Sequence, residues 1–421
     1  MDAVKIFGQM MEKRIETNPK SAARLMDTAF QAYGQVHRLA GKGMPSRRYM
    51  LWACNRATGK SLNRPKNSAI VSIFTPCKVL HAMDILPVFP EGLSCYMAAI
   101  GCERGLLEKA ENSGVPETLC SYHKLLMGLA ESDVIPRPSF VLNTTLACDA
   151  NQLTFRRLSE YYGTPHFVLD VPYRDSERNI EYLQKQLQDM TDFIEENTGK
   201  KLREDRLAET MERSRRSLEN YRQALRLKFD RSESLKMTSH MIDAFALHVL
   251  RGTRETEHYT QRLIEDLKKL PKRREGLRIL WVHTLPYWQE SLCRIFDYND
   301  RVEIAVCDMD IDAPEDLTWT DPYRTMAEYL IRNWYNGPSQ RRVGRTLEYA
   351  EKMKADGIIY FCHWGCKQTL GASAAAKQAF EEAGFPALVI DGDGCDRRNV
   401  QEGQMVTRIE AFLEQLEGRR C

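Results

Sequence analysis

Apolar residues along the chain predict short buried strands that alternate with amphipathic helices. Apolar runs typical of strands in a parallel sheet are found at residues 69–74, 85–89, 140–143, 166–171, 278–282, 302–307, 358–361 and 387–390. Between most of them, apolar residues recur every three or four positions, as they do in helices that pack one face on a core. One such stretch predicts a single helix over 93–109. This alternation predicts an α/β fold with parallel sheets.

The strands fall into two groups, which divide the chain into four parts. We predict an N-terminal helical segment over 1–65, a first α/β domain over 66–175 and a second over 276–421. Residues 176–275 are highly charged and keep a helical period, so a long helical insertion is expected there, ending in a basic linker at 271–274. The domains are expected to be Rossmann- or flavodoxin-like, with strand ends forming the ligand side.

The two α/β domains share an internal correspondence. In the first, a strand leads to Cys148, a helix, a Gly-x-Pro turn at 163–165 and another strand. In the second, a strand leads to Cys366, a helix, a Gly-x-Pro turn at 384–386 and another strand. Glycine ends the helix and proline prevents its continuation, so the chain returns to the sheet. We therefore expect Cys148 and Cys366 at equivalent strand ends, on two sides of an interdomain cleft.

Charge and composition restrict the classes of partner. The chain has 421 residues, with 60 basic and 58 acidic side chains and a net charge of +2. This balance argues against nucleic acid as the main partner. The N-terminus lacks the apolar core of a signal peptide, and no apolar run approaches the length of a membrane span. We expect a soluble, cytoplasmic protein.

Twelve cysteines are unusual for such a protein. A reducing compartment disfavours structural disulfides, and the absence of any CxxC pair excludes zinc-ribbon and thioredoxin patterns. Core thiols and scattered metal ligands remain as explanations, and single cysteines on separate loops are one way to bind an iron–sulfur cluster. Cys362 and Cys366 follow an apolar run, where either a buried core role or a ligand role is possible.

A nucleotide site is not expected at Thr58-Gly59-Lys60-Ser61, although these residues resemble the end of a phosphate-binding loop. Such a loop needs a glycine where this chain has Cys54, and no apolar strand leads into it. We therefore expect no ATP binding through this element.

Several motifs together resemble the 2-hydroxyacyl-CoA dehydratase and benzoyl-CoA reductase family over most of the chain. They are HAMDILPV at 81–88, LCSY at 119–122, LACD at 146–149, DAPEDL at 312–317 and the stretch from Cys366 through DGDGCD at 391–396 to RIEAF at 408–412. The resemblance implies that Cys120, Cys148 and Cys366 bind a [4Fe–4S] cluster. It also implies that an ATP-hydrolysing iron–sulfur activator protein supplies low-potential electrons.

Three further cysteines, Cys95, Cys362 and Cys395, resemble the double-cubane branch of this family. That branch implies an [8Fe-9S] cluster held by six cysteines in a homodimeric reductase of small molecules. The remaining cysteines are interpreted as core or surface thiols; they are Cys54, Cys77, Cys102, Cys293, Cys307 and Cys421. His363 is a candidate proton donor or a donor to cluster sulfur, and a structural histidine is the alternative.

Three functions follow from the resemblance. The first is an activator-dependent reductase with a double-cubane cluster. The second is a 2-hydroxyacyl-CoA dehydratase subunit with one [4Fe–4S] cluster, paired with a sister subunit in a heterodimer. The third is a non-catalytic electron carrier. The substrate is not readable from the residues, and use of an acyl-CoA is implied only by the family.

Overall fold

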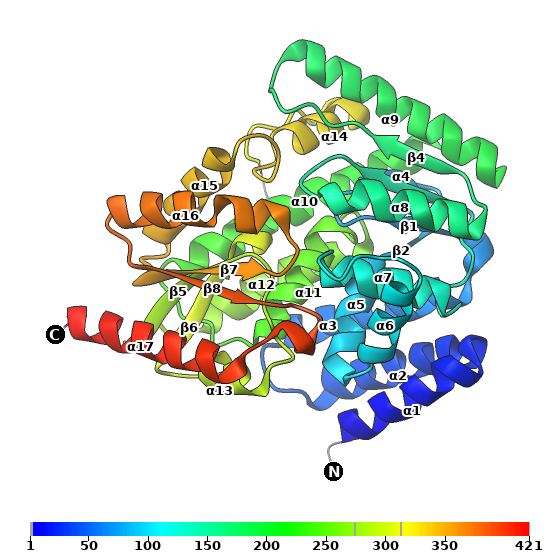
Figure 1. The fold of residues 1–421 in the computed structure, drawn as a ribbon. Coiled ribbons are helices and arrows are strands. Elements are labelled where there is room, and N and C mark those ends of the chain that lie inside the picture. Colours follow the sequence, from blue (N-terminus) through cyan, green and yellow to red (C-terminus); the bar gives the residue numbers. More distant parts are fainter. Residues whose placement is uncertain (1–2, 273–274, 312–313, 421) are drawn as a thin grey trace.

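Two four-stranded parallel sheets with the same strand order form the framework of the protein (Figure 1). The computed structural model describes residues 3–272, 275–311 and 314–420. The first sheet has the order β2-β1-β3-β4 and the second the order β6-β5-β7-β8. Their strands are β1 (Ser68–Val71), β2 (Leu86–Val88), β3 (Phe140–Thr144), β4 (His166–Leu169), β5 (Leu277–Val282), β6 (Val302–Cys307), β7 (Gly357–His363) and β8 (Ala387–Gly392). The predicted α/β class with two parallel-sheet domains is confirmed.

The identical strand orders support the internal correspondence found in the sequence. In each sheet, the second strand along the chain pairs with one side of the first strand, and the third strand pairs with the other side of the first. The crossing places a topological switch point between β1 and β3, and another between β5 and β7. Ligands of open α/β sheets bind at such points, beyond the carboxyl ends of the strands.

The N-terminal segment is helical, as predicted. It contains α1 (Ala3–Thr17), α2 (Pro19–Ala40) and α3 (Pro45–Asn63). Thr58 and Ser61 lie inside α3, and their hydroxyls donate to the helix carbonyls of Cys54 and Thr58 at 2.9 and 2.8 Å. These residues therefore form a helix turn and not a phosphate-binding loop.

The helices of the first α/β domain follow the prediction except at one position. They are α4 (Lys78–Ala82), α5 (Pro90–Ile100), α6 (Arg104–Asn112), α7 (Ser121–Glu131) and α8 (Asp149–Tyr162). The single helix expected over 93–109 is in fact two. Gly101 has φ of +72° and caps α5 by donating its N–H to the carbonyls of Met97 and Ala98. This left-handed turn, which glycine adopts without a steric penalty, ends the helix.

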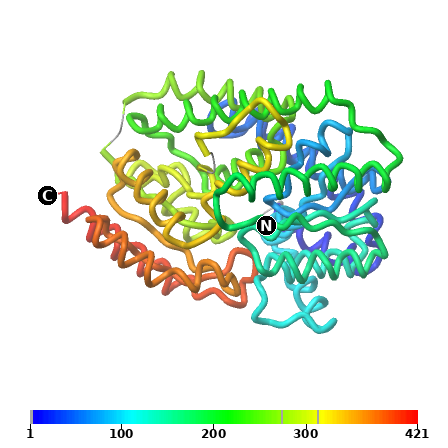
Figure 2. Tube along the Cα trace, turned by 90° about the horizontal axis from the view of Figure 1, so that it is seen from above, coloured from blue at the N-terminus to red at the C-terminus, as the bar shows by residue number. Residues whose placement is uncertain are grey.

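The long insertion is also helical, with α9 (Glu177–Thr198), α10 (Glu204–Lys228), α11 (Met237–His248) and α12 (Arg254–Lys269). Figure 2 shows the two longest of them, α9 and α10, in green. Buried Arg47 of α3 forms ion pairs with Glu233 at 2.8 Å and with Asp243 of α11. The insertion is therefore joined to the N-terminal helices by charges that no solvent screens.

The second domain completes its sheet with helices α13 (Glu290–Phe296), α14 (Pro322–Ile331), α15 (Ser339–Lys352), α16 (Lys367–Glu382) and α17 (Glu402–Arg420). Arg273 and Arg274 of the expected linker, Asp312 and Ala313 of the DAPEDL motif, and Cys421 lie outside the described residues. Among the residues that are described, no helix is both long enough and apolar enough to cross a membrane. The domain limits 66–175 and 276–421 stay predictions.

Candidate metal centre

Cys120, Cys148 and Cys366 lie at equivalent positions in three different helices. Each is the N-cap residue of a helix, namely α7, α8 and α16. The free N–H groups and the positive end of the helix dipole at this position stabilise a thiolate. All three line one large cavity of about 1420 Å³, to which both domains contribute. The structure thus brings together the three cysteines that the family resemblance singled out.

The three thiols are close enough to affect one another. Burial raises the pKa of Cys120 well above its ordinary value, and neighbouring Cys366 and Cys148 raise it further. Burial, followed by Cys366, raises the pKa of Cys148 to about 12. Cys120 and Cys148 are therefore deprotonated together only when positive charge is bound beside them, as a metal centre provides.

A glycine makes the contact between the two domains possible at this point. Gly365, between β7 and α16, has φ of +75°. A Cβ atom there would lie 2.5 Å from the backbone N of Cys120 and 2.7 Å from the carbonyl carbon of Leu119. Only a residue without a side chain fits between these backbones. Gly365 therefore sets the approach of the Cys366 turn to the Cys120 turn.

His363 lies within hydrogen-bonding distance of a predicted ligand. Its Nε2 is 3.2 Å from Sγ of Cys120, and its Nδ1 accepts the backbone N–H of Gly394 at 3.0 Å. Because Nδ1 is an acceptor, the single proton of the neutral ring is on Nε2. Burial lowers the pKa of His363, which keeps the ring neutral. His363 is therefore a hydrogen-bond donor to the sulfur of Cys120.

His123 contacts Cys148 with the opposite hydrogen-bond direction, its Nε2 being an acceptor, and sequence reasoning missed this contact. Its Nε2 is 3.3 Å from Sγ of Cys148, and its Nδ1 is 2.8 Å from Oγ1 of Thr154. The Thr154 hydroxyl donates to the carbonyl of Ala150 at 2.9 Å, so it receives the proton of Nδ1. Burial lowers the pKa of His123 to about 3. Its position one helical turn after Cys120 was the available signal.

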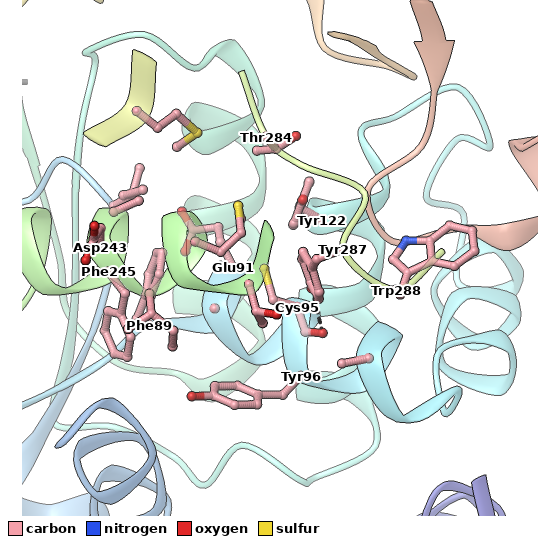
Figure 3. A pocket seen from close by; sticks show the side chains of 18 of the residues that line it. Phe89, Glu91, Cys95, Tyr96, Tyr122, Asp243, Phe245, Thr284, Tyr287 and Trp288 are labelled. Atoms are coloured by element: carbon pink, nitrogen blue, oxygen red, sulfur yellow. Dashed lines mark hydrogen bonds between the residues drawn. The ribbon is translucent and has the colours of Figure 1, made fainter. Parts of the chain in front are cut away.

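Cys95 and Cys395 form a second pair of thiols. Cys95 lies on α5 and lines the cavity, while Cys395 is buried in the loop after β8. A hydrogen bond with Cys395 lowers the pKa of Cys95, whereas burial raises the pKa of Cys395. Figure 3 shows Cys95 beside Tyr122 and Tyr287 on the cavity wall. The two domains therefore meet at this pair as well.

Cys362 lies apart from that pair. Side chains alternate along a strand, and Tyr360 and Cys362 share the face of β7 that α16 covers. The hydroxyl of Tyr360 donates to the carbonyl of Thr369 at 3.1 Å, and the Cys362 thiol is hydrogen-bonded with Ser373. Cys362 is buried beneath α16 and is not among the residues that line the cavity. Its role as a cluster ligand stays a prediction, for which this position offers no support.

The remaining cysteines in the described residues are dispersed. Cys54, Cys77, Cys102 and Cys307 are buried, and Cys293 is half-buried at the cavity wall. Burial raises the pKa of Cys77 and of Cys102 to about 12. These positions agree with their interpretation as core thiols.

The loop at 391–396 joins the second domain to the first. Asp393 accepts hydrogen bonds from the hydroxyl of Ser121, from the backbone N–H of Cys395 at 2.9 Å and from that of Asp396 at 3.0 Å. Asp396 in turn pairs with buried Lys124 at 3.4 Å. One carboxylate therefore orders the turn that carries Cys395 and attaches it next to Cys120.

Glu91 is a second cavity residue that sequence reasoning missed. It lies in the first turn of α5, just after β2, and lines the cavity. Burial raises the pKa of Glu91 to about 8, and its Oε2 atom has no hydrogen-bond partner among the described residues. The carboxyl group thus carries a proton near neutral pH. Its place after a strand end was the signal that could have identified it.

The donor set fits a cluster better than a single ion. No three His, Cys, Asp or Glu side chains within residues 3–272, 275–311 and 314–420 converge as one bound ion requires. A single zinc ion holds its sulfur ligands at about 2.3 Å from one point. In a cubane each cysteine binds a different iron, so the thiols stand further apart. Cys120, Cys148 and Cys366 are compatible with that arrangement.

Comparison with known proteins identifies the family. Residues 72–416 match the family described as 2-hydroxyglutaryl-CoA dehydratase, D-component. The chain is 25% identical over 362 residues to the (R)-phenyllactyl-CoA dehydratase alpha subunit of Clostridium sporogenes, covering 80% of this chain and 87% of that relative.

Two further relatives are a subunit of a reductase and the beta subunit of the same dehydratase. One component of the benzoyl-CoA reductase of Thauera aromatica is 21% identical over 409 residues, covering 87% of this chain and 92% of that relative. The (R)-phenyllactyl-CoA dehydratase beta subunit of Clostridium sporogenes is 28% identical over 171 residues, covering 39% of this chain and 44% of that relative. The chain therefore belongs to the 2-hydroxyglutaryl-CoA dehydratase D-component family.

Proposed function

We propose that this chain is a cluster-bearing component of a 2-hydroxyacyl-CoA dehydratase, in which Cys120, Cys148 and Cys366 hold one [4Fe–4S] cluster. The observation that carries the proposal is the convergence of these three N-cap thiols on one interdomain cavity. When bound, the cluster would supply low-potential one-electron chemistry and a Lewis-acidic iron. His363 would donate a hydrogen bond to the sulfur of Cys120, and Glu91 would hold a proton at the cavity wall.

The cavity suits a ligand as large as a CoA thioester. Its volume of about 1420 Å³ is above the range of about 300–1,000 Å³ typical of small-molecule pockets. Besides the cysteines it is lined by a basic and aromatic group, formed by His37, Lys42, Arg48, Lys236 and Tyr298. The ammonium of Lys236 lies 5.7 Å from the centre of the Tyr298 ring. Cations beside an aromatic ring are a suitable environment for a nucleotide with phosphate groups.

The position of Cys362 favours the dehydratase over the double-cubane reductase. A second cubane on Cys95, Cys362 and Cys395 would need Cys362 to leave its place beneath α16. The pair of Cys95 and Cys395 supplies two ligands of that trio at most. The [8Fe-9S] reductase stays a prediction that iron content tests, and the electron carrier is the remaining alternative.

Two protein partners belong to this proposal. An ATP-hydrolysing iron–sulfur activator would deliver the electron, since Thr58–Ser61 supplies no phosphate loop. A sister subunit would complete a heterodimer, because relatives of this chain are named as alpha and beta subunits. The alternative of a homodimer is distinguished by the mass of the active complex.

The experiment is turnover under anaerobic conditions. Purified protein, co-produced with a sister subunit, is mixed with an activator ATPase, ATP, a chemical reductant and a 2-hydroxyacyl-CoA. We expect formation of the 2-enoyl-CoA only with both activator and ATP, and no product with Cys148→Ser. A fully loaded protein that transfers electrons but never forms product would instead be an electron carrier.

A further inference from the structure

His283 has a backbone conformation that histidine rarely adopts. It follows β5 directly and has φ of +81°, in the region that favours glycine. Its N–H donates to Oδ1 of Asp308 at 2.7 Å, and its carbonyl accepts the thiol of Cys307 at 3.2 Å. Both contacts hold the backbone in this unfavourable conformation. Such strain persists where the surroundings impose it, and it is concentrated at functional sites.

The imidazole of His283 has no partner in the described part of the chain. Its Nδ1 is buried without a hydrogen bond, and the structure assigns the ring no other hydrogen bond or ion pair with residues 3–272, 275–311 or 314–420. The side chain lines the cavity, with its ring centre 6.2 Å from that of His363. Nε2 has no partner among these residues either, and unlike Nδ1 it is not buried, so it is the ring nitrogen that a molecule in the cavity can reach.

The equivalent residue of the first domain shows that the fold does not require this arrangement. Ser72 follows β1 as His283 follows β5. Its backbone N–H donates to the carbonyl of Leu142 at 3.3 Å, and its hydroxyl is 3.0 Å from that of Thr75. Ser72 is thus satisfied within the protein. The strained backbone and the unpartnered ring of His283 are therefore related to the cavity and are not required by the strand order that the two sheets share.

We propose that His283 is a substrate-binding residue whose Nε2–H donates a hydrogen bond to the carbonyl oxygen of a thioester in the cavity. The inference rests on the proposed function, since it takes its ligand from there. Burial lowers the pKa of His283 well below its ordinary value, so the ring is neutral and carries one N–H. Nδ1 is buried with no acceptor for a proton, so the N–H is placed on Nε2, the ring nitrogen open to the cavity. A single neutral donor suits an uncharged oxygen acceptor, which a thioester carbonyl provides.

Binding of two ligands that differ at this carbonyl tests the proposal. Butyryl-CoA contains the thioester, and S-butyl-CoA replaces its C=O by CH₂. Affinity for each is measured by calorimetry on the full chain and on His283→Asn. Asparagine tolerates positive φ, so the variant removes the imidazole and keeps the backbone. His258→Asn, at an exposed histidine, is the matched control.

We expect His283→Asn to weaken butyryl-CoA binding roughly tenfold, as loss of one hydrogen bond does, and to leave S-butyl-CoA binding unchanged. Equal weakening of both ligands, or no change in either, would overturn the assignment of His283 to the carbonyl. If the unmodified protein binds neither ligand, the proposed function fails and this inference fails with it. That result differs from the other two, because it is seen before any substitution is made.

Discussion

His363, at the end of β7, donates a hydrogen bond through Nε2 to Sγ of Cys120, 3.2 Å away on the other domain. The direction of this bond follows from the backbone N–H of Gly394, which occupies Nδ1 at 3.0 Å. A donor to a ligand sulfur stabilises negative charge on that sulfur. The bond is therefore a means by which one domain adjusts a thiolate of the other.

Removing this donor should lower the reduction potential of a bound cluster. Reduction adds negative charge to the cluster, and the hydrogen bond favours that charge. For His363→Leu we expect a midpoint lower by about 40 mV, from about 1 kcal/mol for one hydrogen bond. The measurement is a redox titration followed by electron paramagnetic resonance, with His258→Leu as control. An unchanged midpoint would show that the bond is absent in the loaded protein.

Replacing any one of the three N-cap cysteines should prevent cluster binding. Cys120→Ser, Cys148→Ser and Cys366→Ser each remove one thiolate from the set that lines the cavity. We expect loss of most iron and acid-labile sulfide from anaerobically purified protein. Cys54→Ala, in the buried core of α3, should keep both. Full iron in a serine variant would exclude that residue from the ligand set.

Iron content also separates one cubane from two. We expect about four irons per chain and not about eight, because Cys362 faces Ser373 beneath α16. Cys362→Ala should leave the iron unchanged. If Cys362→Ala halves the iron, and the double variant Cys95→Ser with Cys395→Ser does the same, the double-cubane interpretation is correct.

A side chain at Gly365 should disturb the site, whereas one at Gly371 should not. In Gly365→Ala the new Cβ meets the backbone of Cys120 at 2.5 Å, and the residue keeps a positive φ. The backbone conformation alone costs about 1–2 kcal/mol. We expect a lower free energy of unfolding in denaturant and reduced iron. Gly371→Ala, on α16 with nothing within 4 Å of its added Cβ, should be neutral or slightly stabilising.

The carboxyl group of Glu91 should make stability depend on pH. Burial raises its pKa from the ordinary 4.5 to about 8, so between these values the folded protein holds a proton that the unfolded chain has lost. Stability therefore falls as pH rises through this window, and below it the two states are protonated alike. Glu91→Gln should remove this dependence. Near pH 8 its free energy of unfolding should exceed that of the unmodified protein by on the order of 3 kcal/mol.

Denaturant unfolding at pH 5, 6.5 and 8 measures this difference. Glu117→Gln, at an exposed position before α7, is the matched control and should follow the unmodified protein. If the Glu91→Gln difference stays constant across the three pH values, Glu91 is ionised throughout and holds no proton at the cavity wall.

Much of the fold was predictable because its signals are local. The apolar runs marked all eight strands, and the glycines at Gly163 and Gly384 marked the helix ends before β4 and β8. The prediction failed at Gly101, where an apolar period continued through a break in the helix. Hydrophobic period alone does not detect a left-handed turn, since the flanking helices α5 and α6 both pack on the core.

The site was predictable in part, and the prediction rested on family resemblance and not on local signals. The trio Cys120, Cys148 and Cys366 came from family resemblance, and the cavity position of each agrees with it. Cys362 was grouped with Cys95 and Cys395 by resemblance to the double-cubane branch. In a strand, however, the direction of a side chain depends on whether its position is odd or even. Tyr360 and Cys362 share the α16 face, so the structure places Cys362 outside the cavity lining, and its ligand role stays a prediction.

By itself the sequence determined the alternation of strands and helices, the repeated plan of two sheets and the cysteines placed at helix starts. These depend on backbone preferences and burial patterns within a few residues of each other. Only the tertiary structure decided that His363 faces Cys120, 243 positions away, and that Cys95 meets Cys395. It also placed His283, with its strained backbone, on the cavity wall. These relations depend on how two separately formed sheets pack together, and neither local propensity nor hydrophobic period carries that information.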